Sequence, residues 1–316
     1  MTLNGSVEVA TTGVSGQTDN STELSDSDRS TLVIVTASLT AFGILTNLLV
    51  LLYIGIKRLF RNYVSSHFIG HLAFTNLVAC TILLPLFINN LANGDTLGGI
   101  NILCRFHAFF TTCVWAVLHY MTMCIAGVHL LTFARIHYDQ LFGLHPTIIC
   151  CLSWIIGAAL GLPCITNGDI AVYDPRWHHC IWNYSPSGYK FLTYLVLLGV
   201  LLPSLLTWYA YVRVLGILYH SPIVFQALGL YKSRFLVYGF LLSPLYPVPF
   251  FVTRLFYDST PVVQTISMFL AYFQCVVSPT LYGMSLFLMK EEDMALTARA
   301  HKGATYQAPG IMPQQL

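Results

Sequence analysis

Charge is scarce in this sequence of 316 residues. Lys, Arg, Asp and Glu make up only 9% of it, whereas hydrophobic residues make up 56%, and the mean hydropathy is +0.67. A soluble domain carries about 25% charged residues, so the composition excludes a soluble enzyme. It also excludes a disordered chain and a small secreted disulfide scaffold, and a net charge of +2 gives no basis for binding nucleic acid. The remaining class is an integral membrane protein.

Long segments without any charged residue account for most of the chain. Seven segments lack Asp, Glu, Lys and Arg altogether, and each has about 19 residues or more. This length is close to the roughly 20 apolar residues that a helix needs to cross a bilayer. We therefore predict an all-α fold, an integral membrane bundle of seven transmembrane helices. The predicted spans are about 32–56, 66–90, 101–134, 146–165, 188–219, 232–257 and 261–285.

Polar segments flank this bundle, which we place at 32–289. Residues 1–31 are rich in Ser and Thr and lack the apolar core of a signal peptide, so a disordered, glycosylated tail is predicted. Residues 286–316 are expected to form a short amphipathic eighth helix and a short tail. No repeat relates two halves of the chain, as in many transporters. The common catalytic and nucleotide-binding motifs are absent, so we predict no enzyme, no cofactor and no metal.

The connections between the spans differ in charge. With the N-terminus outside, the inner segments contain ten basic and four acidic residues, and the outer segments contain five basic and nine acidic residues. This distribution agrees with the positive-inside rule and predicts an extracellular N-terminus and a cytoplasmic C-terminus in the plasma membrane. Asn4 and Asn20 begin glycosylation tripeptides in the tail, and Asn183 begins a weaker third that lies close to a predicted helix.

Landmark residues occur in a characteristic order along the spans. They are Asn47, Asn76 within Leu72-Ala73-Phe74-Thr75-Asn76-Leu77, Cys104, Trp154, Cys180, Pro203, Tyr211, Pro247 and Ser278-Pro279-Thr280-Leu281-Tyr282. In this order they resemble those of rhodopsin-like (class A) G-protein-coupled receptors over about residues 32–297. The Ser-Pro-x-x-Tyr-Gly ending is also similar to divergent fish odorant-type receptors and their orphan relatives. The stretch from Cys180 into the fifth span is similar to melatonin-type receptors.

The resemblance implies an orphan or chemosensory receptor that signals through a heterotrimeric G protein. It also implies a disulfide between Cys104 and Cys180, which both face the oxidising side; the alternative is two free thiols. In the family, residues at the positions of Tyr211 and Tyr282 swing inward on activation. Three prolines lie in the spans concerned, namely Pro203, Pro247 and Pro279. They would supply the helix kinks for that motion. The alternative is that they only shape static packing.

Departures from the family pattern affect the expected switches. Asn76 replaces a sodium-binding Asp, and its neutral amide predicts weak or absent sodium sensitivity, with a hydrogen-bonded water cluster as the alternative. Ser278 replaces the Asn of the Asn-Pro-x-x-Tyr motif. His129 replaces the Arg of the Asp-Arg-Tyr triplet and offers no permanently charged fork of donors. Because His titrates near neutral pH, it suggests a proton-sensitive switch, alone or with His67 and His71; the alternative is ordinary packing at helix interfaces and headgroups.

The predicted ligand site is apolar and contains no acid. Amine receptors need a buried carboxylate, but Thr111 occupies its place, and Tyr272 occupies the place of the retinal-binding Lys of opsins. The sequence therefore disfavours recognition of amines and the retinal-binding function of opsins. Aromatic, apolar and hydroxyl side chains near the outer ends of the helices suit a small lipophilic or neutral ligand, although packing between helices is the alternative. The candidates are Thr111, Thr112, Trp115, Trp182, Val248, Met268 and Tyr272.

Two features near the predicted outer mouth receive simpler interpretations. Arg105, His107, Arg176 and Arg254 could attract an anion, but Arg residues such as Arg254 are interpreted as anchors that extend to the lipid headgroups. A zinc site at His178-His179-Cys180 is disfavoured, because three adjacent residues cannot easily supply a tetrahedral set of ligands.

Two other functions remain open at the sequence level. One is a non-signalling receptor-like protein, a heterodimer partner or decoy whose switches have eroded. The other is a transporter or intramembrane enzyme, which is disfavoured because the spans offer only His, Asn and Gln as polar groups for chemistry. The predicted partners are a heterotrimeric G protein, an extracellular small molecule, the lipid bilayer and, optionally, a receptor dimer, with no nucleic acid.

Overall fold

The structure, a computed structural model, describes residues 25–61, 63–94, 101–134, 136, 138–141, 143–175, 177–220, 233–255 and 260–305. In these residues seven helices are long and apolar enough to cross a membrane. The predicted all-α fold and the number of spans are confirmed. The glycosylation predictions at Asn4 and Asn20 lie outside the described residues.

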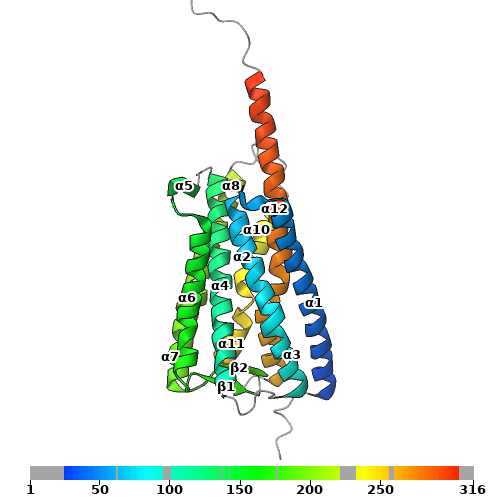
Figure 1. Cartoon of the computed structure of the whole chain (residues 1–316), viewed down its shortest axis with the longest axis vertical. Helices are drawn as coiled ribbons and strands as arrows, with labels where there is room; N and C mark the ends of the chain where they lie inside the picture. Colours follow the sequence, from blue (N-terminus) through cyan, green and yellow to red (C-terminus); the bar gives the residue numbers. More distant parts are fainter. Residues whose placement is uncertain are drawn as a thin grey trace, which may run out of the picture.

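The spans are built from the following elements (Figure 1). They are α1 (Asp26–Ile56); α2 (Val64–Val78), η2 (Ala79–Leu83) and α3 (Leu84–Asn93); α4 (Asn101–Ala134); α6 (Pro146–Thr166); α7 (Pro186–Tyr194), η3 (Leu195–Leu201) and α8 (Leu202–His220); α10 (Ser233–Leu242), η5 (Ser243–Leu245) and α11 (Val248–Leu255); and α12 (Pro261–Thr305). Short helices η1 (Leu59–Arg61) and α5 (Tyr138–Leu141) lie in connections.

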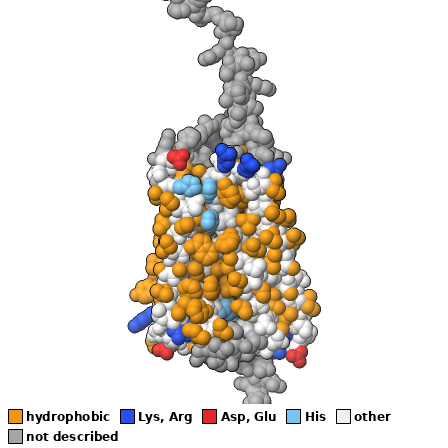
Figure 2. Space-filling model, in the orientation of Figure 1, with side chains coloured by type: hydrophobic (Ala, Val, Ile, Leu, Met, Phe, Trp, Pro, Cys, Tyr) orange, Lys and Arg blue, Asp and Glu red, His pale blue; other side chains and the backbone are white. Residues whose placement is uncertain are grey.

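Helix α4 is the centre of the bundle and packs against α2, α6 and α8, while α12 packs against α1, α2 and α11. Glycines permit the closest of these approaches. A Cβ atom added at Gly157 of α6 would lie 2.9 Å from the carbonyl oxygen of Cys113 in α4, so only glycine fits at this crossing. Hydrophobic side chains cover the outside of the bundle between ends that carry the charged residues (Figure 2), as a lipid environment requires.

Proline residues interrupt the sixth span. The sequence predicts one helix over 232–257, but the described part is divided into α10, a 3-10 turn that contains Pro244, and α11. Pro244 and Pro247 lack the N–H groups that a continuous helix would use, and the chain turns at Tyr246 and Pro247. Two other spans contain π-helical turns, at Ala79–Leu83 and Leu195–Leu201, each just before a proline. Such π-helical turns typically occur as single-turn bulges inside α-helices.

Two predicted boundaries are wrong. The N-terminal tail was expected to continue to residue 31, but α1 begins at Asp26, and Asp26 and Asp28 lie in its first turn, where acids interact favourably with the helix dipole. A separate eighth helix was expected after residue 286, but α12 continues unbroken to Thr305 and extends beyond the bundle (Figure 1). The segment after Leu286 contains no Gly or Pro before Gly303, so nothing in it favours a break.

A β-hairpin closes one end of the bundle, which we call the hairpin end. Strands β1 (Ala171–Asp174) and β2 (His179–Trp182) pair antiparallel, with Ala171 opposite Trp182 and Asp174 opposite His179. All four residues of β2 are buried. Helix α1 begins at this end, whereas α12 extends from the opposite end (Figure 1). The hairpin is therefore part of the packed interior rather than a loop lying on the surface.

Candidate functional site

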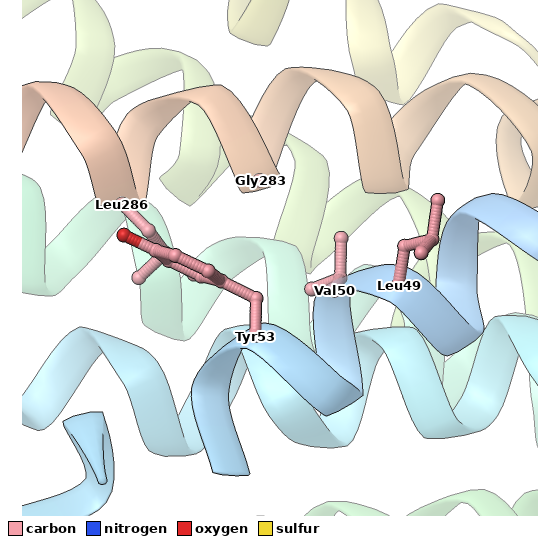
Figure 3. A pocket seen from close by; sticks show the side chains of 5 residues that line it. All are labelled: Leu49, Val50, Tyr53, Gly283 and Leu286. Carbon is pink, nitrogen blue, oxygen red and sulfur yellow. The ribbon is translucent and has the colours of Figure 1, made fainter. Parts of the chain in front are cut away.

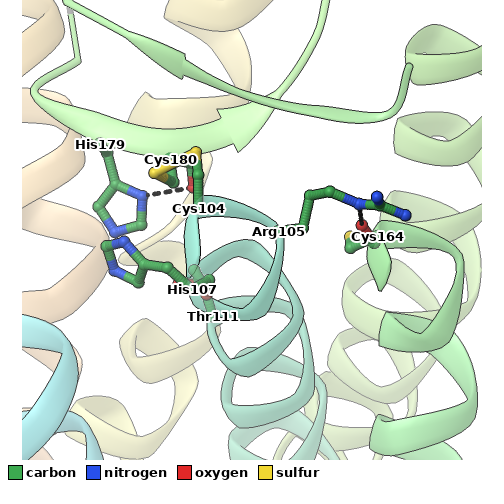
Figure 4. The surroundings of a disulfide bond; sticks show 7 residues. All are labelled: Cys104, Arg105, His107, Thr111, Cys164, His179 and Cys180. Atoms are coloured by element: carbon green, nitrogen blue, oxygen red, sulfur yellow. Dashed lines mark hydrogen bonds between the residues drawn. A yellow bond between two sulfur atoms is a disulfide. The ribbon is translucent and has the colours of Figure 1, made fainter. Parts of the chain in front are cut away.

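A disulfide joins the hairpin to the central helix. Cys104 in the first turns of α4 is bonded to Cys180 in β2, with a Cα–Cα distance of 5.2 Å (Figure 4). The predicted bridge is therefore present, and the alternative of two free thiols is wrong. Because the bridge links residues 76 apart, it holds β2 over the end of α4.

Strand β2 also makes hydrogen bonds inside the bundle. The indole N–H of Trp182 donates to Thr112 Oγ1 of α4 at 3.1 Å. On the other side, His179 Nε2 lies 2.7 Å from the Tyr272 hydroxyl of α12. The hairpin thus connects α4 and α12, and its side chains occupy the space in which the sequence predicts a ligand.

An aromatic cluster lies directly beneath the hairpin, and we define it as Trp115, Trp177, Trp182, Phe250 and Tyr272. The ring of Trp115 lies edge-on to three others, at 5.8 Å from Trp182, 5.3 Å from Phe250 and 5.8 Å from Tyr272. Phe250 lies 5.0 Å from Trp177. All five rings are buried. Four separate segments, α4, the hairpin, α11 and α12, therefore meet in one apolar centre.

Six of the seven predicted pocket residues are buried at this end: Thr111, Thr112, Trp115, Trp182, Met268 and Tyr272. The prediction of Val248 is wrong, because its side chain is 39% exposed. The sequence alignment assumed a continuous sixth helix, but the turn at Tyr246 and Pro247 changes which face points inward. Phe250, two residues later, is fully buried instead.

Two imidazole rings face each other next to the disulfide (Figure 4). The rings of His107 and His179 are 4.1 Å apart between centroids and inclined by 34°. His179 Nδ1 lies 2.8 Å from the Cys180 carbonyl oxygen, whereas neither ring nitrogen of His107 has a partner among the described residues. Burial, and then the proximity of His107, hold the pKa of His179 well below its usual range. His179 is therefore neutral near pH 7.

A buried ion pair fixes the hairpin to α11. Arg254 Nη1 lies 3.3 Å from Asp174 Oδ2 of β1, and the guanidinium also donates to the carbonyl oxygen of Trp182. The central carbon of the guanidinium, Cζ of Arg254, lies 3.7 Å from the centroid of the Tyr184 ring. The interpretation of Arg254 as a headgroup anchor is wrong, since only 2% of its side chain is exposed. Its partner is 80 positions away in sequence, so no local pattern signals the pair.

A second cluster lies toward the opposite end of the bundle. His129 Nδ1 lies 3.2 Å from the Tyr211 hydroxyl. Phe240 stacks on two tyrosines, at 5.2 Å from Tyr211 with an angle of 25° and at 4.8 Å from Tyr282 with an angle of 12°. The predicted positions His129, Tyr211 and Tyr282 therefore do come together, the two tyrosine hydroxyl groups interact with each other, and Phe240 of α10 packs against both rings.

Amide side chains connect helices near the middle of the bundle. Asn76 Nδ2 donates to Ser278 Oγ at 2.8 Å, and Asn47 Nδ2 donates to the carbonyl oxygen of Cys275 at 3.0 Å. The Oδ1 atoms of both Asn residues are buried and have no partner among the described residues. Trp154 is half-buried and packs against Phe74.

The three hinge candidates occupy different local environments. Pro203 lies in the first turn of α8, immediately after a π-helical turn, Pro247 lies in the turn before α11, and Pro279 lies inside α12. Of the three, Pro247 is therefore the one placed where a helix is divided.

The remaining histidines do not assemble with His129. His67 packs on His145, with ring centroids 5.3 Å apart, and its Nε2 lies 2.8 Å from the Phe60 carbonyl oxygen. No group of three or more His, Cys, Asp or Glu side chains suitable for a metal ion occurs in the described part of the chain.

A shallow apolar groove lies between α1 and α12 on the outside of the bundle. It is lined by Leu49, Val50, Tyr53, Gly283 and Leu286, and Tyr53 extends across it toward Leu286 (Figure 3). A Cβ atom at Gly283 would lie 3.0 Å from Val50 Cγ2, so glycine permits the close approach of the helices. The groove has no charged lining residue and belongs to the exterior surface.

Sequence reasoning missed several residues of the hairpin end as members of the site. Trp177, Phe250 and Asp174 received no role, and His179 entered only as a disfavoured zinc ligand. The nearest available signal was the density of aromatic and His residues around Cys180, which is unusual for a connection between apolar helices.

Comparison with known families gives a match over most of the chain. Residues 46–282 match the model of the family described as "7 transmembrane receptor (rhodopsin family)". No curated protein matches the chain.

Proposed function

Because the chain belongs to the rhodopsin family of seven-transmembrane receptors, we propose that it binds an extracellular, small, lipophilic or neutral ligand and signals through a heterotrimeric G protein. The family is one of receptors and not of enzymes. The protein is a multi-pass membrane protein, in agreement with its seven apolar helices.

We place the hairpin end outside the cell, in the plasma membrane. The excess of basic residues in the alternate connections supports this orientation. The disulfide between Cys104 and Cys180 lies at the same end and would be maintained in an oxidising compartment. The end from which α12 extends is then cytoplasmic.

The observation that carries the ligand proposal is the aromatic cluster with its nearby hydroxyl and imidazole groups. The carboxylate described beside it, that of Asp174, is already paired with Arg254. An amine ligand would lack a free counter-ion here, whereas an apolar body with an uncharged polar group would find aromatic surface and hydrogen-bonding partners.

The arrangement also gives a route from ligand to G protein. Ligand contacts at Phe250 act on α11, which the turn at Pro247 separates from α10. Phe240 in α10 stacks on both Tyr211 and Tyr282. A ligand that favours a different position of the sixth span would therefore alter the tyrosine cluster, provided that it binds that state more tightly.

A non-signalling receptor-like protein is the second candidate, and His129 favours it. In this structure His129 is buried and lies within hydrogen-bonding distance of Tyr211. It cannot provide the permanent charge and the fork of donors that Arg provides. A receptor dimer partner or a decoy would keep the fold, although it would lack the Arg side chain through which family members contact a G protein.

A G-protein dissociation assay on surface-expressed protein tests the proposal. The wild type is compared with His129→Arg and Asn76→Asp, each with and without a small-molecule library. Signalling by the wild type, increased by His129→Arg, supports the proposal. Silence from all three proteins at normal surface levels contradicts it and supports the non-signalling candidate.

A further inference from the structure

Several hydrogen-bond donors at the hairpin end are buried without an acceptor. The indole N–H groups of Trp115 and Trp177 and Nε of Arg254 lack partners among the described residues, and so does the ring of His107, which carries one N–H donor when it is neutral. All four side chains are at least nine-tenths buried. A buried donor without an acceptor costs about 1–3 kcal/mol, so the cluster is energetically incomplete in this state.

These donors are not scattered. Trp115 and Trp177 both contact Phe250, at 5.3 Å and 5.0 Å, and the guanidinium of Arg254 lies 5.7 Å from the Trp177 ring. His107 reaches the same centre through His179, whose ring lies 5.9 Å from that of Tyr272. The unpartnered donors therefore surround one contiguous region centred on Phe250 and Tyr272.

Acceptors in this region are already engaged. The Asp174 carboxylate and the Trp182 carbonyl oxygen accept from Arg254. The Thr112 hydroxyl accepts from Trp182, and the Tyr272 hydroxyl lies within hydrogen-bonding distance of His179. Indole N–H and guanidinium N–H groups can only donate, so these donors cannot satisfy one another. A ligand that brings an acceptor would satisfy them.

We propose that the aromatic cluster recognises a lipophilic ligand whose polar head only accepts hydrogen bonds, namely the carbonyl oxygen of an ester or a carboxylate. This inference rests on the proposed function and specifies the chemical class of its ligand. An ammonium head would add donors to a site that lacks acceptors and would place a second cation near Arg254. A carbonyl oxygen has two lone pairs and satisfies two donors at once.

The position of Phe250 couples recognition to movement. Since its ring contacts both Trp115 and Trp177, a head group that reaches both indoles takes the place of this ring. Phe250 belongs to α11, so head-group binding displaces the half of the sixth span that follows the turn at Pro247. An apolar molecule of the same length without the carbonyl group would not gain these hydrogen bonds.

Intrinsic fluorescence provides a direct binding assay, because three of the five Trp residues belong to the cluster. The full-length receptor in lipid nanodiscs is titrated with sodium decanoate, methyl decanoate and decylamine, which share one chain. The Trp variants lack one of the fluorescent residues, so their binding is measured by a second readout, the ligand-induced rise in unfolding temperature. We expect saturable binding of decanoate and of methyl decanoate, and none of decylamine.

Variants then test the donors one by one. Trp115→Phe and Trp177→Phe each keep the aromatic ring and remove the N–H, so each should weaken binding of the acceptor probes about threefold to tenfold. Trp208→Phe is the matched control, because its N–H donates to the Leu241 carbonyl oxygen elsewhere in the bundle, and it should bind as the wild type does. His107→Phe is used in addition, so that the test does not depend on one variant folding.

Three outcomes would overturn the inference. They are equal binding of decylamine, unchanged affinity in folded Trp115→Phe and Trp177→Phe, and a non-saturable signal that reflects partition into lipid. Failure of the proposed function is distinguishable from these. Saturable acceptor binding without G-protein activation contradicts signalling but leaves the recognition chemistry intact, whereas activation by an amine supports signalling and contradicts the inference.

Discussion

His129 Nδ1 lies 3.2 Å from the hydroxyl of Tyr211, so the residue that replaces the family's Arg is in contact with one of the two tyrosines that the family uses as a switch. The contact closes a cluster in which Phe240 stacks on both Tyr211 and Tyr282. Buried groups without a permanent charge thus connect α4, α8, α10 and α12 toward the end opposite the hairpin.

Removal of the Phe240 ring should loosen the tyrosine cluster. In Phe240→Ala, α10 loses its stacking on Tyr211 of α8 and on Tyr282 of α12, which favours states in which the sixth span has moved away from them. We expect basal G-protein activation to rise about fivefold, the population change that roughly 1 kcal/mol produces. The measurement is ligand-free G-protein dissociation normalised to surface level.

The matched control is Phe110→Ala, whose side chain is exposed on α4. A basal activity of Phe240→Ala equal to or below that of the wild type would show that the Phe240 ring does not restrain the sixth span.

Breaking the buried ion pair should destabilise the hairpin end. Asp174→Ala leaves the Arg254 guanidinium buried without its carboxylate, which costs about 3–5 kcal/mol. The double variant Asp174→Asn with Arg254→Gln removes both charges and should recover part of this loss. Thermal unfolding in a fixed detergent provides the comparison. Asp169→Asn, at an exposed position near the hairpin, should leave the unfolding temperature unchanged.

Acid should loosen the hairpin. The pKa of His179 is held well below its usual value by burial and by His107, so neutral His179 contributes stability above the ordinary His pKa of about 6.5. That contribution is lost as the pH falls below this value, because protonation then favours the open state. The described groups that face His179 are His107 of α4, Phe87 of α3 and Tyr272 of α12. The acidic residue nearest in the β ladder is Asp174, which lies opposite His179 and is paired with Arg254.

Hydrogen exchange of the β1–β2 amides tests this pH dependence. After correction for the intrinsic rate, protection should be lower at about pH 5 than at about pH 7.5, and the difference should shrink in His179→Phe. Equal loss of protection in the wild type and in His179→Phe would assign the effect to other groups.

Sodium should have little influence on the receptor. Asn76 is neutral and its amide donates to Ser278, so the carboxylate that would attract the ion is missing. Replacing sodium by choline at constant ionic strength should leave the unfolding temperature of the wild type unchanged. Its basal activity should change less than about twofold, because no carboxylate is present at this position to attract the ion. Asn76→Asp should acquire a sodium dependence. A strong effect of sodium on the wild type would contradict this assignment.

The seven helices could be predicted from the sequence because each span is a local run of apolar residues. The disulfide between Cys104 and Cys180 was predicted from the family resemblance, together with the position of both residues on one side of the spans. The resemblance also placed Thr111, Trp115 and Tyr272 near that end, where all three are buried. Burial of Val248 was predicted wrongly because the prolines of the sixth span change its face.

Long-range pairs were outside the reach of such reasoning. Arg254 looks like an interfacial anchor until Asp174, 80 positions away, is brought beside it by the hairpin. The stacking of Phe240 on Tyr211 and Tyr282 likewise depends on how α10 is rotated, which apolar composition alone does not specify. The eighth helix was expected from the family pattern, whereas the local sequence after Leu286 continues the helix.

The hairpin is attached to three helices at once: to α4 by the Cys104–Cys180 bridge, to α11 by Asp174 and Arg254, and to α12 by His179 and Tyr272. A ligand arriving from water must wait for at least one noncovalent attachment to open, so association should be slower than typical diffusion-controlled encounter. Dissociation passes the same barrier, and the residence time of a bound ligand should be long. A lipophilic molecule dissolved in the bilayer avoids this barrier by passing between helices, so the observed rate should follow its concentration in the membrane.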